Sequence, residues 1–186
     1  MKTMKIKPIE RLCKARRELI TIKGINESGE VLSVWLGDGR GCYRLDGTPP
    51  MTSEDFLGIF DVPKAERGAW STEDKLTDKP VFGGDAAGDD VLLETAEGGV
   101  IIDGESFSPL KDSSGGVCWI PDSYLKPLNK VPELSFRLRK LGDAGTVCAM
   151  SGLLLAAVIS PQLTEFEQSV MQDIRRAIAS SGLEDF

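Results

Sequence analysis

The chain has 186 residues, of which 41% are hydrophobic and 27% are charged, and its formal net charge is −7 at pH 7. This length suffices for one good-sized domain, and the composition is typical of a globular protein rather than a disordered one. The chain contains no histidine, which excludes Ser-His-Asp and Cys-His catalysis as usually built and most zinc or iron sites.

The first third of the chain predicts a short helix followed by a β-meander. Pro8 opens a helix over residues 8–19, because proline is tolerated in the first helical turn. β-Branched and apolar runs separated by turn residues then predict strands at 18–25, 30–37 and 42–47. This order indicates two successive hairpins.

The stretch WLGDGRGCYRLDGTPP, residues 35–50, is the densest run of possible chemistry in the chain. The Asp-Gly pair at Asp38 lies between two β-prone runs, which is a strong hairpin signal because glycine adopts positive φ. The pair at Asp46 precedes two prolines and indicates a second turn. The alternative is that Asp38, Asp46 and Asp61 gather as metal ligands or as an acid–base pair. Turn chemistry accounts for both pairs, so we favour turns.

Residues 52–90 predict one short helix and then a long loop. Thr52 or Ser53 is the helix N-cap, two acidic residues follow in the first turn, and the helix ends near Ile59. Residues 64–90 have no clear period and are predicted to be a surface loop or a partly ordered linker. Their aspartates match neither a calcium loop nor a phosphate-binding loop.

The chain returns to β-prone runs after residue 90. Short apolar segments broken by Gly and Asp predict strands at 90–96, 99–104, 105–110 and 116–121. A helical turn is expected at 121–128, and alternating apolar and polar residues predict a half-buried strand at 133–141. Residues 146–160 suit a core strand up to about Met150, and beyond it both helix and strand stay open.

The clearest element is a helix over residues 160–183. Ser160 is its N-cap, Pro161 its first residue, and Gly182 lies just past its end. Its apolar stripe recurs at threes and fours and comprises Leu163, Phe166, Val170, Ile174 and Ile178. Such a stripe normally docks a helix on a sheet, and the alternative is contact with a partner or a second copy of the chain.

These elements place the chain in the α+β class. We expect small antiparallel β-sheet or barrel-like units, a short N-terminal helix and a long C-terminal amphipathic helix packed on the sheet. The expected organisation is a helix plus β-meander over residues 1–63, a loop or partly ordered linker over 64–90, and a β-rich region ending in the helix over 91–186. A single domain over 1–186 is the alternative.

Cysteine usage and hydropathy bear on the cellular compartment. Four widely spaced cysteines form no Cys-x-x-Cys pair: Cys13, Cys42, Cys118 and Cys148. Reduced thiols in a cytoplasmic protein are therefore expected, rather than zinc ligands or a disulfide framework. The basic N-terminus has no apolar stretch behind it, and no apolar run reaches the roughly 18 to 20 residues of a membrane span. We expect neither a secretory signal nor a membrane segment.

Charge is distributed unevenly along the chain. Residues 1–23 carry a balance of +6, whereas residues 73–112 carry −8. Such a split is found in nucleic-acid arms and acidic partner surfaces, but charge runs are usually solvated helix faces or pack against each other. We favour the second interpretation, because the overall acidity opposes non-specific binding to phosphate backbones.

The aromatic residues divide between core and surface. Trp35 and Trp119 lie in strand-like apolar runs and are expected in the core. Trp70, beside the polar run STEDK, is the better candidate for an exposed contact residue. The alternative is a stacking platform for bases or sugars that also includes Tyr43 and Tyr124.

Four segments together resemble small uncharacterised proteins encoded in prophages of Gram-positive bacteria. In chain order they are IKPIERLCKARREL, WLGDGRGCYRLDGTPP, FLGIFDVP and CWIPDSYLKPL. The likeness covers the first third of the chain and the segment 117–128, and its motifs are hairpin-like rather than catalytic. It implies a phage-associated interaction or structural role, and it assigns no functional residue.

The function we expect is a non-enzymatic protein–protein interaction or structural module, prophage-associated, whose ligand is a protein partner or a second copy of the chain. We assign no catalytic, cofactor-binding or metal-binding residue, because the sequence has no nucleophile, phosphate-loop or metal motif. One alternative is a hydrolase or nuclease that uses a divalent cation held by acids from 38–61 or 85–90. The other is a nucleic-acid-associated or DNA-mimicking protein.

Overall fold

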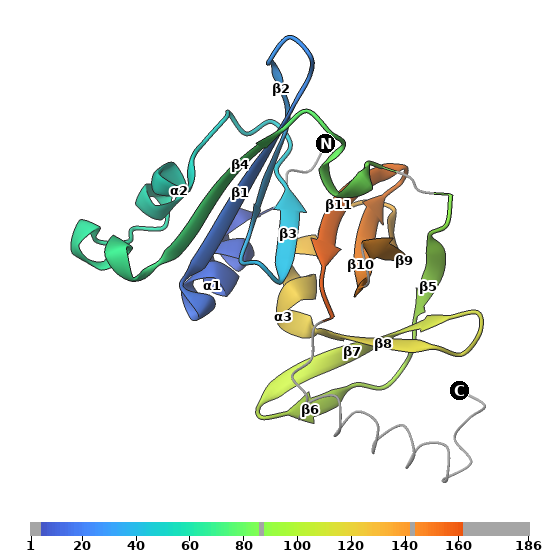
Figure 1. The fold of residues 1–186 in the computed structure, drawn as a ribbon. Coiled ribbons are helices and arrows are strands. Elements are labelled where there is room, and N and C mark those ends of the chain that lie inside the picture. Colours follow the sequence, from blue (N-terminus) through green and yellow to red (C-terminus); the bar gives the residue numbers. More distant parts are fainter. Residues whose placement is uncertain (1–4, 86–87, 142–143, 162–186) are drawn as a thin grey trace.

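The computed structural model describes residues 5–85, 88–141 and 144–161. The strands are β1 Glu18–Ile25, β2 Val31–Gly37, β3 Gly41–Arg44, β4 Ser71–Thr77, β5 Val91–Thr95, β6 Val100–Ile102, β7 Glu105–Asp112, β8 Val117–Pro121, β9 Leu134–Leu141, β10 Ala144–Ser151 and β11 Leu154–Ile159. Within the described residues they form one eleven-stranded sheet in the order β4-β1-β2-β3-β11-β10-β9-β5-β7-β6, with β8 paired on β7 (Figure 1). β4 pairs parallel with β1, and the other pairs are antiparallel.

The helices are short and contact strands of both halves of the sheet. They are α1 Ile6–Arg16, α2 Ser53–Ile59 and α3 Asp122–Leu125, with the 3₁₀ turns η1 Lys64–Ala69, η2 Val81–Gly83 and η3 Lys126–Leu128. α2 packs on β1 and β4, whereas α1 packs on β1 and β2 and also contacts α3 and η3. α1 thereby joins the meander to the second half of the chain. Among the described residues no helix has the length and apolar character needed to cross a bilayer.

The expected α+β class is wrong, because the described residues are mostly β-sheet with short helices. The predicted small sheet units are instead continuous, since β11 lies between β3 and β10. Val158 of β11 is opposite Cys42 on one side and Cys148 on the other. Turn signals act between neighbouring segments and carry no information on pairing between distant strands. The long helix predicted over 160–183 lies outside the described residues, apart from its first two positions.

The segment 64–90, expected to be a loop or partly ordered linker, contains η1, β4 and η2. β4 extends the sheet beyond β1, with Lys75 opposite Ile22 and Asp74 opposite Thr21. It is an edge strand whose side chains are mostly exposed on both faces. Its sequence therefore lacks the alternation of apolar and polar residues by which a half-buried strand is recognised.

Other local predictions are confirmed. The Thr52 hydroxyl accepts a hydrogen bond from the N–H of Asp55 at 3.3 Å, while the Asp55 carboxylate accepts from the N–H of Thr52 at 2.8 Å. This capping box starts α2 as expected. α1 is shorter at its end than the predicted 8–19, because Arg17 adopts a left-handed φ of 52°. The segment after Met150, left open above, forms β11.

Two hydrophobic clusters lie on opposite faces of the central strands. Leu36 and Tyr43 face the larger cluster, which includes buried residues of α1 and α2. The alternating neighbours Trp35 and Cys42 face a second cluster that includes Val158. Both faces of β3 and of the second half of β2 are therefore buried, and each large side chain buried there contributes roughly 1.5 to 3 kcal/mol.

The tryptophans follow the prediction in two of three cases. Trp35 and Trp119 are buried, with 2% and 7% of their surface exposed. Trp70 is half-buried against the larger cluster and is not the exposed contact residue that we expected. Tyr43 and Tyr124 are buried as well. These rings are used for packing rather than as an exposed stacking platform.

A buried ion pair holds the segment that follows β4 against the second face of the sheet. The guanidinium of Arg139 on β9 donates to the two carboxylate oxygens of Asp90 at 2.8 and 2.6 Å. Arg139 also donates to the carbonyl oxygens of Phe82 and Gly84, at 2.9 and 2.8 Å. The ring of Phe82 meets Trp35 edge to face, with centroids 5.3 Å apart. Long-range contacts thus hold Phe82, Gly84 and Asp90 in place, in a stretch of sequence that has no periodic pattern.

Candidate functional site

The candidate site is built around the turn between β2 and β3. Asp38 is 1% exposed, and its Oδ1 accepts hydrogen bonds from the backbone N–H of Arg40 at 3.1 Å and of Gly41 at 2.9 Å. Its own N–H donates to the Gly41 carbonyl oxygen at 3.1 Å, and Gly39 has a φ of +79°. The hairpin turn predicted at Asp38 is therefore confirmed, and the Asp46-Gly47 pair also forms a turn.

Two further glycines of this stretch are required by close packing. A Cβ at Gly37 would lie 1.9 Å from the carbonyl oxygen of Gly41. A Cβ at Gly41 would lie 2.7 Å from Cδ1 of the Tyr124 ring. Both distances are far below a van der Waals contact, so only glycine lets the turn close and the ring of α3 lie on its backbone.

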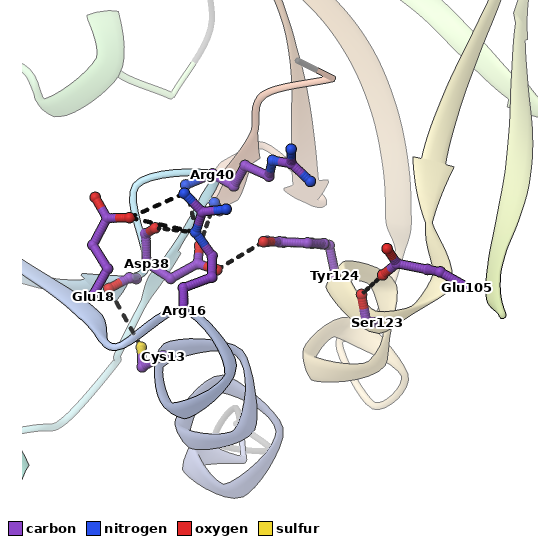
Figure 2. A network of polar contacts seen from close by, with 10 residues as sticks. Cys13, Arg16, Glu18, Asp38, Arg40, Glu105, Ser123 and Tyr124 are labelled. Atoms are coloured by element: carbon purple, nitrogen blue, oxygen red, sulfur yellow. Dashed lines mark hydrogen bonds and ion pairs between the residues drawn. The ribbon is translucent and has the colours of Figure 1, made fainter. Parts of the chain in front are cut away.

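Hydrogen bonds join this turn to α1 and α3 (Figure 2). The Tyr124 hydroxyl donates to Oδ2 of Asp38 at 2.7 Å, and the Tyr43 hydroxyl donates to the carbonyl oxygen of Tyr124 at 2.8 Å. Arg16 at the end of α1 donates to the carbonyl oxygen of Asp38 at 3.2 Å and pairs with Glu18 at 3.1 Å. The turn, α1 and α3 are therefore held in one fixed arrangement.

The phenols and thiols of this network are held protonated. Burial, followed by the charge of Asp38, raises the pKa of Tyr124 and of Tyr43 above that of a free phenol. Burial likewise raises the pKa of the Cys13 thiol, whose S–H donates to the Gly37 carbonyl oxygen at 3.4 Å. The four cysteines form no disulfide within the described residues. At neutral pH these groups donate hydrogen bonds and do not ionise.

A cleft of about 320 Å³ lies over this network, between α1 and the α3–η3 segment. Four cationic side chains line it: Arg11, Arg16, Arg40 and Lys126. Glu105 is the acidic residue in its wall, and its carboxylate accepts a hydrogen bond from the Ser123 hydroxyl at 2.7 Å. We call this cleft, defined by the four cations and Glu105, the basic cleft.

The cations of the basic cleft are incompletely neutralised. Arg16 is paired with Glu18, but in the described part of the chain Arg11, Arg40 and Lys126 form no ion pair. Lys5, at the start of α1, lies near Lys130. A side-chain hydrogen bond with Lys130, followed by the positive charge of Lys130, lowers the pKa of Lys5. A chain whose net charge is −7 therefore gathers an excess of positive charge along one face of α1.

The charged side chains of α1 lie mostly on a solvated helix face, one of the two arrangements that we favoured for the basic segment. Most charged residues of α1 are exposed, and Lys14 pairs with Glu10 one turn away at 2.6 Å. The acidic segment 73–112 also packs against the basic segment, because residues 73–76 of β4 pair with residues 20–23 of β1 and Glu105 lies in the basic cleft beside α1.

The structure does not bring the alternative carboxylate site together. Asp46 is partly exposed and pairs with Arg44 at 3.3 Å, while Asp61 is exposed just after α2. Asp38 is buried in its turn, as described above. Within residues 5–85, 88–141 and 144–161 no group of three or more Cys, Asp or Glu side chains is arranged to hold a metal ion.

The basic cleft could not be found from the sequence. Arg11, Arg40 and Lys126 come from α1, the β2–β3 turn and η3, and no spacing in the sequence connects them. The positive balance of residues 1–23 was the single indication, and it did not distinguish Arg11 from its neighbours. Tyr124 was noted as an aromatic residue, but its contact with Asp38 depends on how α3 packs.

No protein-family model, curated protein or solved structure matches the chain. The resemblance to prophage proteins therefore stays an expectation.

Proposed function

We propose that the protein is a non-enzymatic, cytoplasmic interaction module that binds an acidic segment of a partner protein in the basic cleft. One observation carries this proposal. Three cations line the cleft and have no ion-pair partner among the described residues: Arg11, Arg40 and Lys126. Carboxylate side chains of a partner would supply the missing counter-charges.

The rigidity of the cleft supports recognition. Its floor is fixed by the hydrogen bonds of Asp38, Tyr124 and Tyr43, and a binding surface that is already ordered loses little entropy when a ligand arrives. The raised pKa values of Tyr124 and Tyr43 keep both phenols protonated at neutral pH and make them poor proton donors. This chemistry suits binding better than acid–base catalysis.

The charge of the whole chain favours a peptide over a nucleic acid. The net charge of −7 repels the long, uniformly charged backbone of DNA or RNA, whereas a short acidic segment meets only the basic cleft. The proposal includes the association with a prophage that the resemblance implies.

Fluorescence anisotropy with a labelled, Asp- and Glu-rich peptide tests the proposal. We expect saturable binding that weakens with salt, and that the double variant Arg11→Glu/Lys126→Glu weakens at least about tenfold, which corresponds to about 1.4 kcal/mol. The matched control is Lys64→Glu/Lys79→Glu, which changes the net charge equally outside the cleft and should leave the affinity within about twofold.

Three outcomes would overturn the proposal. They are equal binding of a Gln- and Asn-rich peptide of the same length, equal losses in the two double variants, and tighter binding of single-stranded DNA than of the acidic peptide. The last outcome would favour the nucleic-acid alternative.

A further inference from the structure

A second cavity lies on the other face of the sheet, opposite the larger core. Its volume is about 250 Å³. Its apolar walls come from β1, β3, η2 and β11, through Ile20, Ile22, Cys42, Phe82 and Val158. We call it the apolar cavity.

The walls of the apolar cavity are part of the second hydrophobic cluster. Ile22, Cys42 and Val158 are each at most 9% exposed. Burial raises the pKa of the Cys42 thiol to about 12, so the thiol is neutral and acts as a small apolar group. These walls favour the hydrocarbon part of a ligand over water.

The rim of the same cavity carries positive charge. Arg40 and Lys75 both line it, and the charge of Lys75 is felt by the Cys42 thiol in the wall. Lys75 pairs with Glu73 at 3.1 Å, but both side chains are about half exposed, and such a pair is worth little. The guanidinium of Arg40 has no ion-pair partner within the described residues.

The wall formed by η2 is held in place before any ligand binds. The Phe82 carbonyl oxygen accepts from Arg139 at 2.9 Å, and the Phe82 ring packs edge to face on Trp35. Arg139 is itself fixed by both oxygens of Asp90. A cavity whose walls are already ordered retains more of the binding energy of a small ligand.

We propose that the apolar cavity binds a small monocarboxylic acid with a hydrocarbon body, such as a medium-chain fatty acid. The hydrocarbon lies against Ile22, Cys42 and Val158, and the carboxylate pairs with Arg40 and Lys75 at the rim. This site shares Arg40 with the basic cleft, but it takes a different ligand and does not depend on the partner-binding function proposed above.

Titration with sodium octanoate, followed by methyl NMR of Ile20, Ile22 and Val158, tests the proposal. We expect saturable shifts confined to these methyl groups. The matched ligand is 1-octanol, which keeps the hydrocarbon and lacks the charge, and it should bind at least about tenfold more weakly, because it cannot pair with Arg40 and Lys75. Absence of shifts at about 10 mM octanoate, or equal affinity for octanol, would overturn the proposal.

Two exposed variants separate the charge of the rim from the general charge of the protein. Lys75→Gln should weaken octanoate about threefold to tenfold and leave octanol unchanged, since an ion pair at a partly exposed site contributes about 1 kcal/mol. Lys79→Gln changes the net charge equally outside the cavity and should have no effect on either ligand. An equal loss in the two variants would contradict the site. Neither variant alters Arg11 or Lys126, so failure here leaves the peptide test intact.

Discussion

Two buried aspartates anchor the two candidate sites, and they are neutralised in different ways. Asp38, under the basic cleft, accepts hydrogen bonds from two backbone N–H groups and from the Tyr124 hydroxyl, with Arg16 at 3.7 Å. Asp90, behind the apolar cavity, forms a bidentate pair with Arg139, and the two side chains are 1% and 3% exposed. Neutral donors close a local turn, whereas an ion pair joins two distant segments.

The difference predicts unequal consequences when each anchor is broken. Removing Arg139 leaves a buried charge without its main counter-charge, and that loss is costly. Removing the Tyr124 hydroxyl leaves Asp38 with its two backbone donors, and that loss is smaller.

Arg139→Met should lower the free energy of unfolding by about 3 to 5 kcal/mol, because the buried Asp90 carboxylate loses its bidentate pair with Arg139. Urea denaturation measures the loss, and Lys140→Met is the exposed control, expected to change stability by under about 0.5 kcal/mol. The double variant Arg139→Met/Asp90→Leu should recover most of the loss, since the buried carboxylate is removed together with the guanidinium. A loss below about 1 kcal/mol in the single variant would contradict a desolvated pair.

Gly37→Ala should cost about 2 to 3 kcal/mol, because its Cβ would lie 1.9 Å from the Gly41 carbonyl oxygen and would open the turn. Thermal unfolding measures the loss. Gly68→Ala is the control, since no heavy atom lies within 4 Å of its added Cβ. Equal stability of the two variants would show that the Asp38 turn is not tightly packed.

Tyr124→Phe should cost about 1 to 2 kcal/mol at pH 7, because a hydrogen bond to the buried Asp38 carboxylate is lost. The pKa of Tyr124 is raised in the folded state, chiefly by burial. The folded state therefore retains the phenolic proton of Tyr124 to a higher pH than the unfolded state does. The contribution of Tyr124 to the free energy of unfolding falls as the pH rises above the pKa of the unfolded state, which is about 10. Unfolding curves from pH 7 to 11 should decline less steeply in the variant, and an unchanged slope would refute this linkage.

Asp74→Asn should have the smallest effect, under about 1 kcal/mol, because Asp74 lies on the exposed edge strand β4. Burial raises the pKa of Asp74, but hydrogen bonds from Thr21 and Ser53 outweigh it and lower the pKa overall. Its stabilisation is present above the unfolded pKa of about 3.9 and is lost as the pH falls below it. Denaturation experiments should therefore show that the variant has a lower free energy of unfolding than the parent protein at pH 7. This difference should be smaller at pH 3.

Much of the local structure was predictable, because its determinants lie close together in the sequence. The turn at Asp38, the cap at Thr52 and most of the short strands were expected, since each depends on the hydrogen bonds or the alternation of a few neighbouring residues. The burial of Trp35 and Trp119 followed from their apolar surroundings in the same way.

The tertiary structure alone decided how these elements are combined. β11 could join two expected sheets into one, and β4 could form a parallel edge strand, only through pairings between segments far apart in the chain. Neither candidate site was predictable, because charged side chains follow no period and their proximity depends on which elements pack together. Hydrogen bonds within a turn are determined locally, whereas a cluster of cations exists only once α1, the β2–β3 turn and η3 have met.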